Sequence, residues 1–250
     1  MNGITVVANT TVQNAAIIAA PVAAAAIAGN VKATVLVFAR DTASAYSATS
    51  GLNGYAIPFQ VVVVPQAGIT LPVLNSSTIA GNYGAIVVVS EVSYDYGGAL
   101  GFQSAITAAQ WATLYQYQVS FGVRMIRLDA FPGPDFGASA LGGCCNTGVE
   151  QLVSISNTAG FPTSGLKTGA GVSTAGLWHY PATITNTAIA TEFAQFFPTT
   201  GFTTTSTAGV INNVAGRQQV IKVPRETCCS AYLFSDGILY RFRHRLECNF

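Results

Sequence analysis

Residues 33–39 read Ala-Thr-Val-Leu-Val-Phe-Ala, and this stretch decides the fold. An uninterrupted apolar run with β-branched residues is typical of a strand that is buried on both faces of a sheet. Asp41 follows two residues later, in position to cap a short helix through the stretch rich in alanine and serine. Residues 59–64 then predict a second strand, which Pro65 stops.

Two further buried strands are expected at residues 85–89 and 123–128, with a helix between them. Residues 105–121 place Ile, Ala, Leu, Tyr and Phe at roughly helical spacing, and Gly122 closes the segment. Buried strands that alternate with helices form βαβ units, which assemble into a parallel sheet. We therefore predict an α/β fold over residues 32–135, with an open, mostly parallel sheet and flanking helices.

From residue 149 onward, short β-prone segments are separated by Gly, Pro, Thr and Asn. They predict a strand-rich part, which is either a small sandwich or a set of antiparallel strands added to the first sheet. One short helix is expected within residues 186–197. The β-prone segments are residues 151–155, 182–187, 202–205 and 210–213.

Charge is scarce in this sequence. Only 21 of the 250 residues are charged and the net charge is +1, whereas about a quarter of the residues of a typical soluble protein are charged. This gives no electrostatic basis for binding nucleic acid or an anionic membrane. The longest apolar stretch, residues 15–28, is too short and too rich in alanine to span a bilayer. Uncharged polar residues must provide solubility, which fits a secreted protein facing glycans better than a cytosolic enzyme.

The last part of the chain differs from the rest in composition. Residues 217–250 hold 9 charged side chains, against 12 in residues 1–216, together with three of the five cysteines. This tail is either a basic, solvated extension or sequence that does not belong to the fold. We therefore divide the chain into a low-complexity N-terminal segment (1–31), a module (32–219) with an α/β half (32–148) and a strand-rich half (149–219), and an atypical C-terminal tail (220–250).

No catalytic or metal-binding set is recognisable. The two histidines are His179 and His244, and residues 1–219 hold no aspartate with two histidines that would bind a metal. Cys144 and Cys145 lack the Cys-x-x-Cys spacing of a metal or redox site, and no glycine-rich phosphate motif is present. No cofactor is therefore expected. One alternative is an amidotransferase-like enzyme with Cys144 as its nucleophile, but the glycine pattern and the leading strand of a nucleophile elbow are missing.

Aromatic and acidic residues follow the predicted strands. Tyr94, Asp95 and Tyr96 come after the third strand, and Asp129 follows the fourth. Open α/β sheets bind ligands outside the carboxyl ends of their strands, and tyrosine offers an apolar face with a polar tip that suits a sugar ring. The sequence therefore predicts a carbohydrate site at these four residues.

Trp178 and Tyr180 form a second candidate patch in the strand-rich part. For Tyr94, Tyr96 and Trp178, a place in the core remains an open alternative, and Trp111 is assigned to the core. No base, metal or nucleophile accompanies the acidic residues near the strand ends. We therefore interpret them as hydrogen-bonding or turn residues rather than catalysts: Glu91, Asp95, Asp129 and Asp135.

Several stretches, in order along the chain, resemble one protein family. The family is the secreted fungal deacetylase of galactosaminogalactan, a biofilm polysaccharide, and the resemblance is to its N-terminal carbohydrate-binding module. It runs from about residue 33 to residue 219. The stretches that carry it are residues 35–46, 84–94, 121–129, 144–145 with 147–157, and 167–174 with 176–184.

The resemblance implies an extracellular, non-catalytic module that binds a polymer containing N-acetylgalactosamine. In the family, the deacetylase domain follows this module and carries the metal-binding carboxylate and histidines. The resemblance ends at Gln219, so we expect that domain to be missing and transfer no catalytic residue. The family continues with an apolar strand, so residues 220–223 are placed to extend a sheet edge.

The remaining expectations follow from the same resemblance. The sequons at Asn9 and Asn75 would be glycosylated in a secreted protein, although no clear signal peptide is recognisable. The expected partner is the polysaccharide, with no nucleic acid and no membrane, and the protein is expected to be a monomer. A structural spacer without a ligand is the other alternative.

Overall fold

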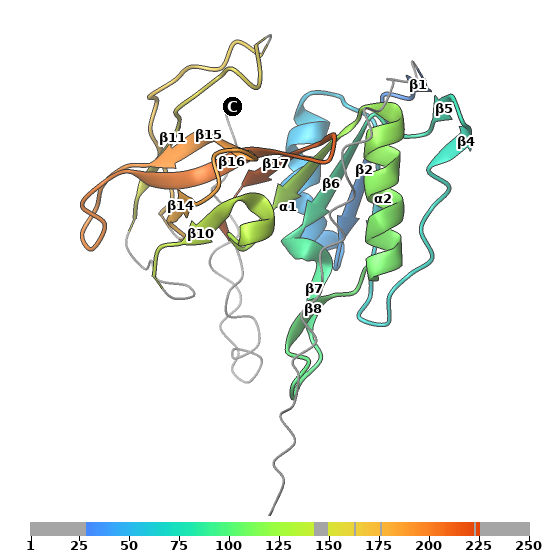
Figure 1. The fold of residues 1–250 in the computed structure, drawn as a ribbon, viewed down its shortest axis with the longest axis horizontal. Coiled ribbons are helices and arrows are strands. Elements are labelled where there is room, and N and C mark those ends of the chain that lie inside the picture. The colour runs from blue at the N-terminus through green and yellow to red at the C-terminus, as the bar shows by residue number, and fades with distance from the viewer. Residues whose placement is uncertain (1–28, 143–149, 163, 176, 223, 226–250) are drawn as a thin grey trace, which may run out of the picture.

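The computed structural model describes residues 29–142, 150–162, 164–175, 177–222 and 224–225, and one mixed sheet runs through these residues (Figure 1). Five neighbouring strands of the sheet are parallel. In spatial order they are β3 (Phe59–Val63), β2 (Val35–Ala39), β6 (Ala85–Val89), β9 (Arg124–Leu128) and β17 (Arg217–Lys222). The strands predicted at residues 33–39, 59–64, 85–89 and 123–128 are therefore confirmed.

Two helices pack on opposite faces of the parallel strands. Each begins with a side-chain cap. At the start of α1 (Thr42–Gly54), Asp41 Oδ1 accepts a hydrogen bond from Ser44 N (2.7 Å), as predicted, and Thr107 caps α2 (Ala108–Phe121). Side chains of β2 alternate between the two faces, since successive residues of a strand point to opposite sides. Leu36 and Phe38 join the cluster around α2, and Val35, Val37 and Ala39 join the cluster around α1.

The strand-rich part does not form a separate sandwich. Its strands continue the same sheet beyond β17 with antiparallel pairing (Figure 1). The fold is therefore dominated by its sheet, and the predicted parallel sheet with helices describes only one side of it. The added strands are β16 (Ser206–Val214), β15 (Ala190–Phe196), β11 (Leu152–Ile155) and β12 (Val172–Ser173), with β14 (Ala182–Ile184) and β10 (Ala138–Ala140) paired beside them.

The prediction of a short helix within residues 186–197 is wrong, because this segment contains strand β15. Its Ala, Glu and Gln are good helix formers. Pairing on both sides, with β16 and with β11, overrides that local preference.

The domain boundary expected at residue 219 falls inside strand β17. Val220 and Ile221 are buried, and β17 pairs with β9 on one side and β16 on the other. Residues 220–222 therefore belong to the middle of the sheet and not to its edge. Cys144, Cys145, Asn9 and the tail beyond residue 225 lie outside the described residues.

Smaller elements surround the sheet. The turns η1 (Ser90–Val92) and η2 (Pro134–Phe136) follow β6 and β9 along the chain. A hairpin projects from the lower end of the sheet in Figure 1. Its strands are β7 (Ser93–Asp95) and β8 (Phe102–Ser104). A separate small sheet is formed by β1 (Asn30–Val31), β5 (Ala80–Gly81) and β4 (Asn75–Ser77), with β5 in the middle. Another is formed by β13 (Trp178–His179) and β18 (Pro224–Arg225).

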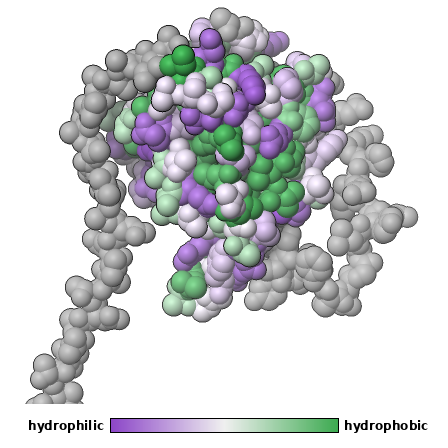
Figure 2. Space-filling model, turned by 90° about the vertical axis from the view of Figure 1, so that its right-hand side faces the viewer, coloured by the Kyte–Doolittle hydropathy of each residue, from purple (hydrophilic) through white to green (hydrophobic). Residues whose placement is uncertain are grey.

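The surface beside α2 is partly apolar. Figure 2 looks onto this side and shows hydrophobic surface gathered in its middle among white and purple side chains. Large exposed apolar residues of the β1–β4–β5 region are Val31, Val73 and Ile79. Within the described residues, no helix is long and apolar enough to cross a membrane.

Candidate functional site

The carboxyl ends of the parallel strands form the candidate site. β2, β6 and β9 pair in parallel, so these ends lie at one edge of the sheet. The strand order reverses at β2, which has β3 on one side and β6 on the other. Such a reversal is the place where open α/β sheets bind ligands. The residues that directly follow the three strands are Arg40, Ser90 and Asp129.

Two turns at this edge hold a left-handed backbone without glycine. Ser90, Glu91 and Val92 have φ of 49°, 54° and 44°, and Asp129 has 57°. This conformation is unfavourable for residues with a Cβ, and most of all for a β-branched residue such as Val92. The Ser90 hydroxyl donates a hydrogen bond to Asp129 Oδ2, which ties the two turns together. Strained backbone of this kind clusters at functional sites, which supports this edge as the site.

Glu91 does not act as a free carboxylate. It forms an ion pair with Arg127, whose side chain is only 5% exposed. The Arg127 guanidinium also lies over the rings of Trp111 (4.2 Å to the centroid) and Phe136 (5.4 Å). Burial acts to lower the pKa of Arg127, but the Glu91 carboxylate outweighs it, so the pKa is raised and the group stays charged. The pair anchors the strained turn to the body of the molecule.

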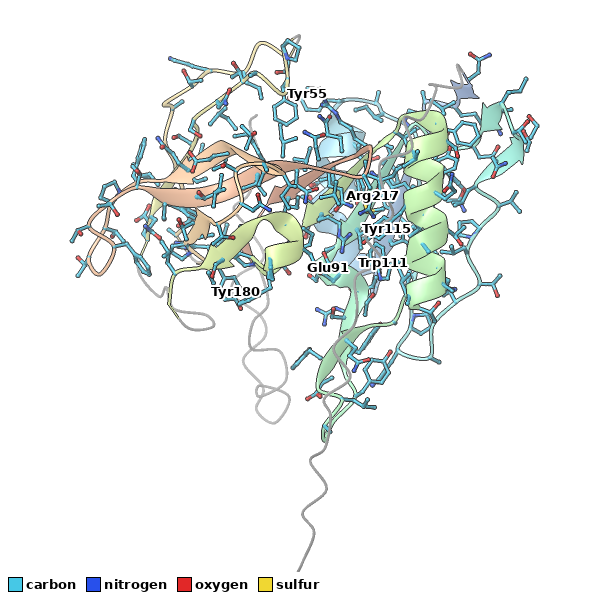
Figure 3. All side chains as sticks on the ribbon, viewed as in Figure 1. Tyr55, Glu91, Trp111, Tyr115, Tyr180 and Arg217 are labelled. Atoms are coloured by element: carbon cyan, nitrogen blue, oxygen red, sulfur yellow. The ribbon has the colours of Figure 1, made fainter. Side chains whose placement is uncertain are left out.

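A stack of rings and guanidinium groups continues from this pair along α2. Trp111 stacks on Tyr115 (5.7 Å between centroids), and the Arg217 guanidinium lies 3.8 Å from the centroid of Tyr115. Figure 3 shows Glu91, Trp111, Tyr115 and Arg217 close together beside α2. Trp111 also packs against the core beneath α2, as the sequence predicted. These rings hold α2 to β9 and β17.

Tyr94 is mainly a structural residue. Its ring packs against the core beneath α2, and its hydroxyl donates a hydrogen bond to the Val64 carbonyl (2.7 Å). Burial raises the pKa of the Tyr94 hydroxyl. The structure therefore favours the core alternative for this residue.

Tyr96 and Asp95 remain accessible at the start of the hairpin loop. Tyr96 is 37% exposed, and its hydroxyl donates a hydrogen bond to the Gln66 carbonyl (2.7 Å). Asp95 is exposed and Asp95 Oδ1 accepts a hydrogen bond from Gly97 N (2.8 Å). These bonds hold the hairpin beside the segment that follows β3, and they leave the Tyr96 ring and one carboxylate oxygen of Asp95 available.

Sequence reasoning missed Arg40. Its Nη1 donates to the Ser93 carbonyl (3.4 Å), and its guanidinium lies 6.0 Å from the centroid of Tyr94. Arg40 Nε is buried and has no hydrogen-bond partner among the described residues. An unsatisfied buried donor is unfavourable, and because Nε is buried, a ligand oxygen can be reached only by the terminal nitrogens of this half-buried guanidinium. A single arginine after a strand carries no sequence signal that would have found it.

The second candidate patch is not a surface formed by Tyr180. The Tyr180 ring is 3% exposed and packs edge-on against Phe131 (5.1 Å), which is itself 55% exposed. Figure 3 shows Tyr180 well away from Glu91 and Trp111. The side chain of Trp178 lies outside what the structure describes. Phe131, two residues after Asp129, is thus an aromatic side chain that is open to a ligand near the strand ends.

The buried histidine next to Tyr180 is also structural. His179 Nε2 donates a hydrogen bond to Gln151 Oε1 (2.8 Å), and Gln151 Nε2 donates to the Phe197 carbonyl (2.9 Å), which fixes the orientation of the amide. Burial lowers the pKa of His179. Among the described residues, no group of three or more His, Cys, Asp and Glu side chains is arranged to hold a metal ion.

Comparison with known proteins identifies the family. The sequence model of a family described as Agd3 CBM87 matches residues 31–222. This chain belongs to the Agd3 CBM87 family. The module of this family is a carbohydrate-binding module, and the match ends at Lys222, the last residue of β17.

A solved structure supports the assignment to Agd3 CBM87. The crystal structure of Agd3, described as a novel carbohydrate deacetylase, is 59% identical with a TM-score of 0.75. The similarity covers 78% of this chain and 30% of that chain, so this chain spans about a third of that relative's length. No curated protein sequence matches the chain.

Two further solved structures resemble this chain only weakly. A β-galactosidase from Rahnella sp. R3 is 11% identical in sequence with a TM-score of 0.47. The match covers 78% of this chain and 29% of the β-galactosidase. A glutamine amidotransferase from Thermotoga maritima is 12% identical in sequence with a TM-score of 0.43. That match covers 76% of this chain and 74% of the amidotransferase. Neither similarity supports a function.

Proposed function

We propose that this chain is a non-catalytic module that binds an N-acetylgalactosamine-containing exopolysaccharide, galactosaminogalactan. Membership of the Agd3 CBM87 family carries the proposal. The solved relative is described as a carbohydrate deacetylase, and a binding module joined to such an enzyme holds the polymer on which the enzyme acts. The proposal also includes an extracellular, monomeric protein.

The side chains at the carboxyl ends of the parallel strands are of the kinds that bind a neutral polymer. Phe131 and Tyr96 present ring faces for the C–H side of sugar rings. Asp95 and Asp129 accept hydrogen bonds from sugar hydroxyls, and Arg40 donates to hydroxyl or acetamide oxygens. The site residues Tyr96, Asp95 and Asp129 therefore keep the role predicted for them, with Arg40 and Phe131 added and Tyr94 and Tyr180 as supports.

Binding of purified polysaccharide by calorimetry tests this function. We expect Phe131→Ala to weaken binding about fivefold or more, since an aromatic contact contributes on the order of 1 kcal/mol. Tyr46→Ala is the matched control, because Tyr46 is a 65% exposed ring on α1. A wild-type chain that binds no polysaccharide would be a structural spacer, and equal effects of the two substitutions would place the site elsewhere.

Asn75 is a proposed glycosylation site of the secreted protein. It lies exposed on β4, where Nδ2 donates to the Ser77 carbonyl (2.9 Å). A glycan at this position extends into solvent. Mass spectrometry of the protein from a eukaryotic secretion host measures its occupancy, and an unmodified Asn75 in secreted protein rejects the proposal.

A further inference from the structure

A pocket opens over the antiparallel part of the sheet, in a region that the strand-end site does not use. Its volume is about 170 Å³, room for roughly six water molecules or for one sugar ring. Strands β15, β16 and β17 form its floor. The residues that line it include Asn157, Glu192, Phe193, Ile211, Asn213 and Gln218.

The loop that walls the pocket is held in place by packing. Phe161 meets Phe193 edge-on (5.5 Å between centroids), and the Arg124 guanidinium lies 5.7 Å from the centroid of Phe161. At Gly160 an added Cβ would come within 2.0 Å of Ile211 Cδ1, so the loop approaches the sheet closely at a residue without a side chain. The pocket is therefore formed before any ligand arrives.

Glu192 is the charged residue of this pocket. Its Oε1 accepts a hydrogen bond from the Ser156 hydroxyl (2.8 Å) and its Oε2 accepts one from the Thr207 hydroxyl (2.7 Å). These bonds orient the carboxylate and leave each oxygen able to accept another. They do not neutralise its charge.

Glu192 forms no ion pair within the described part of the chain, where the ion pair found is that of Glu91 with Arg127. A half-buried carboxylate is stabilised by a positive charge within about 4–6 Å. The pocket thus combines an unpaired, oriented negative charge with the apolar atoms of Phe193 and Ile211 and the amides of Asn157, Asn213 and Gln218.

We propose that this pocket binds a hexosamine through its protonated amine, with Glu192 as the counter-ion. The inference rests on the proposed function and adds a second, charge-selective subsite to it. The ammonium group donates to Glu192, the amides reach the sugar hydroxyls, and Ile211 and Phe193 contact the C–H face. An N-acetylated sugar lacks the charge and adds an acetyl group. The subsite therefore selects the deacetylated residues that a carbohydrate deacetylase leaves in its polymer.

Calorimetry with paired ligands tests the proposal. The probes are a galactosamine oligosaccharide and its fully N-acetylated counterpart of equal length, at a pH below the pKa of the free amine. We expect the intact chain to bind the deacetylated form roughly fivefold more tightly, as for a partly exposed ion pair. Glu192→Gln keeps the shape and both hydroxyl contacts and is expected to abolish this preference. Glu150→Gln removes an exposed carboxylate elsewhere and is expected to leave it intact.

The outcomes separate this inference from the proposed function. Equal binding of both ligands by the wild-type chain, or a preference that survives Glu192→Gln, overturns the charge-selective subsite and leaves polysaccharide binding standing. Binding of neither ligand overturns both. NMR titration gives a readout that needs no variant: galactosamine must shift the amide resonances of residues 191–193. Shifts confined to residues near Tyr96 reject the pocket.

Discussion

Two tyrosines that lie two residues apart in the hairpin have different surroundings. Tyr94 packs into the core beneath α2, whereas Tyr96 is accessible at the start of the hairpin loop. We therefore predict that Tyr96→Ala weakens polysaccharide binding roughly five- to thirtyfold, equivalent to about 1–2 kcal/mol, with little change in melting temperature. Tyr94→Ala is expected to cost about 2 kcal/mol of stability, because buried ring area and the bond to Val64 are lost. Binding and thermal unfolding of both variants check this, and reversed effects would contradict it.

The buried histidine makes stability depend on pH. His179 has a lowered pKa, so the unfolded chain, in which the group titrates near 6.5, binds its proton at higher pH than the folded chain. Below about pH 6.5 the free energy of unfolding therefore falls as the pH falls, and above it this contribution is complete. NMR titration of the imidazole should show a midpoint for His179 below 6.5. A folded-state midpoint at or above 6.5 would contradict the prediction.

Removing the partner of a buried charge is costly. Glu91→Ala leaves Arg127 buried without its counter-ion, and we expect a loss of about 3–5 kcal/mol in the free energy of unfolding. Urea denaturation measures it. Glu150→Ala, at an exposed carboxylate, is expected to change stability by less than about 1 kcal/mol. Similar losses in the two variants would show that the ion pair does not stabilise the turn.

At the scale of the elements, β17 decides where the module ends. A chain cut after Gln219 loses buried Val220 and Ile221 and the pairing of residues 220–222 with β9 and with β16, which amounts to several kcal/mol. Because a whole domain is stable by only about 5–15 kcal/mol, we expect this truncation to unfold or aggregate. A chain cut after Arg225 keeps β17 and β18. Thermal melts followed by circular dichroism give the melting temperatures of the two truncated chains. Equal melting temperatures would show that residues 220–225 contribute nothing to stability.

Local patterns predicted the elements whose environment is uniform. The β2 run is apolar throughout because both of its faces are covered, and Asp41 caps α1 within three residues of sequence. β15 could not be predicted in the same way. Its composition favours a helix, and only pairing with β11 and β16 makes it a strand. The pairing of β17 with β9 joins segments that are far apart in the sequence, which no local pattern contains.

The candidate site was predictable to a similar degree. The rule that ligands meet the carboxyl ends of parallel strands led to Tyr96, Asp95 and Asp129 from sequence alone. Whether a given aromatic ring there is covered depends on three-dimensional packing, so Tyr94 and Tyr180 could not be told apart from Tyr96. The strained turn at Ser90 has no glycine to signal it.

For the whole molecule, the low charge sets how binding responds to salt. The net charge is +1, and in the site that we propose at the strand ends, rings and hydrogen bonds contact a neutral polymer. Screening by salt weakens interactions between exposed charges and leaves these contacts unchanged. We predict that affinity for the fully N-acetylated polymer changes less than about twofold between low and moderate salt. Calorimetry across a salt series checks this, and a steep decline would reveal an ionic interface.

The insertion of β17 between β9 and β16 also affects how the protein is made. On the ribosome, β9 is completed at Leu128, but its neighbour β17 begins only at Arg217. At translation rates of about 5–20 residues per second, the open edge of β9 waits on the order of ten seconds for its partner. Unpaired strand edges invite pairing with other chains. Yield of this protein in cells should therefore depend on chaperones, and on translation speed over residues 129–216, more than its final stability would indicate.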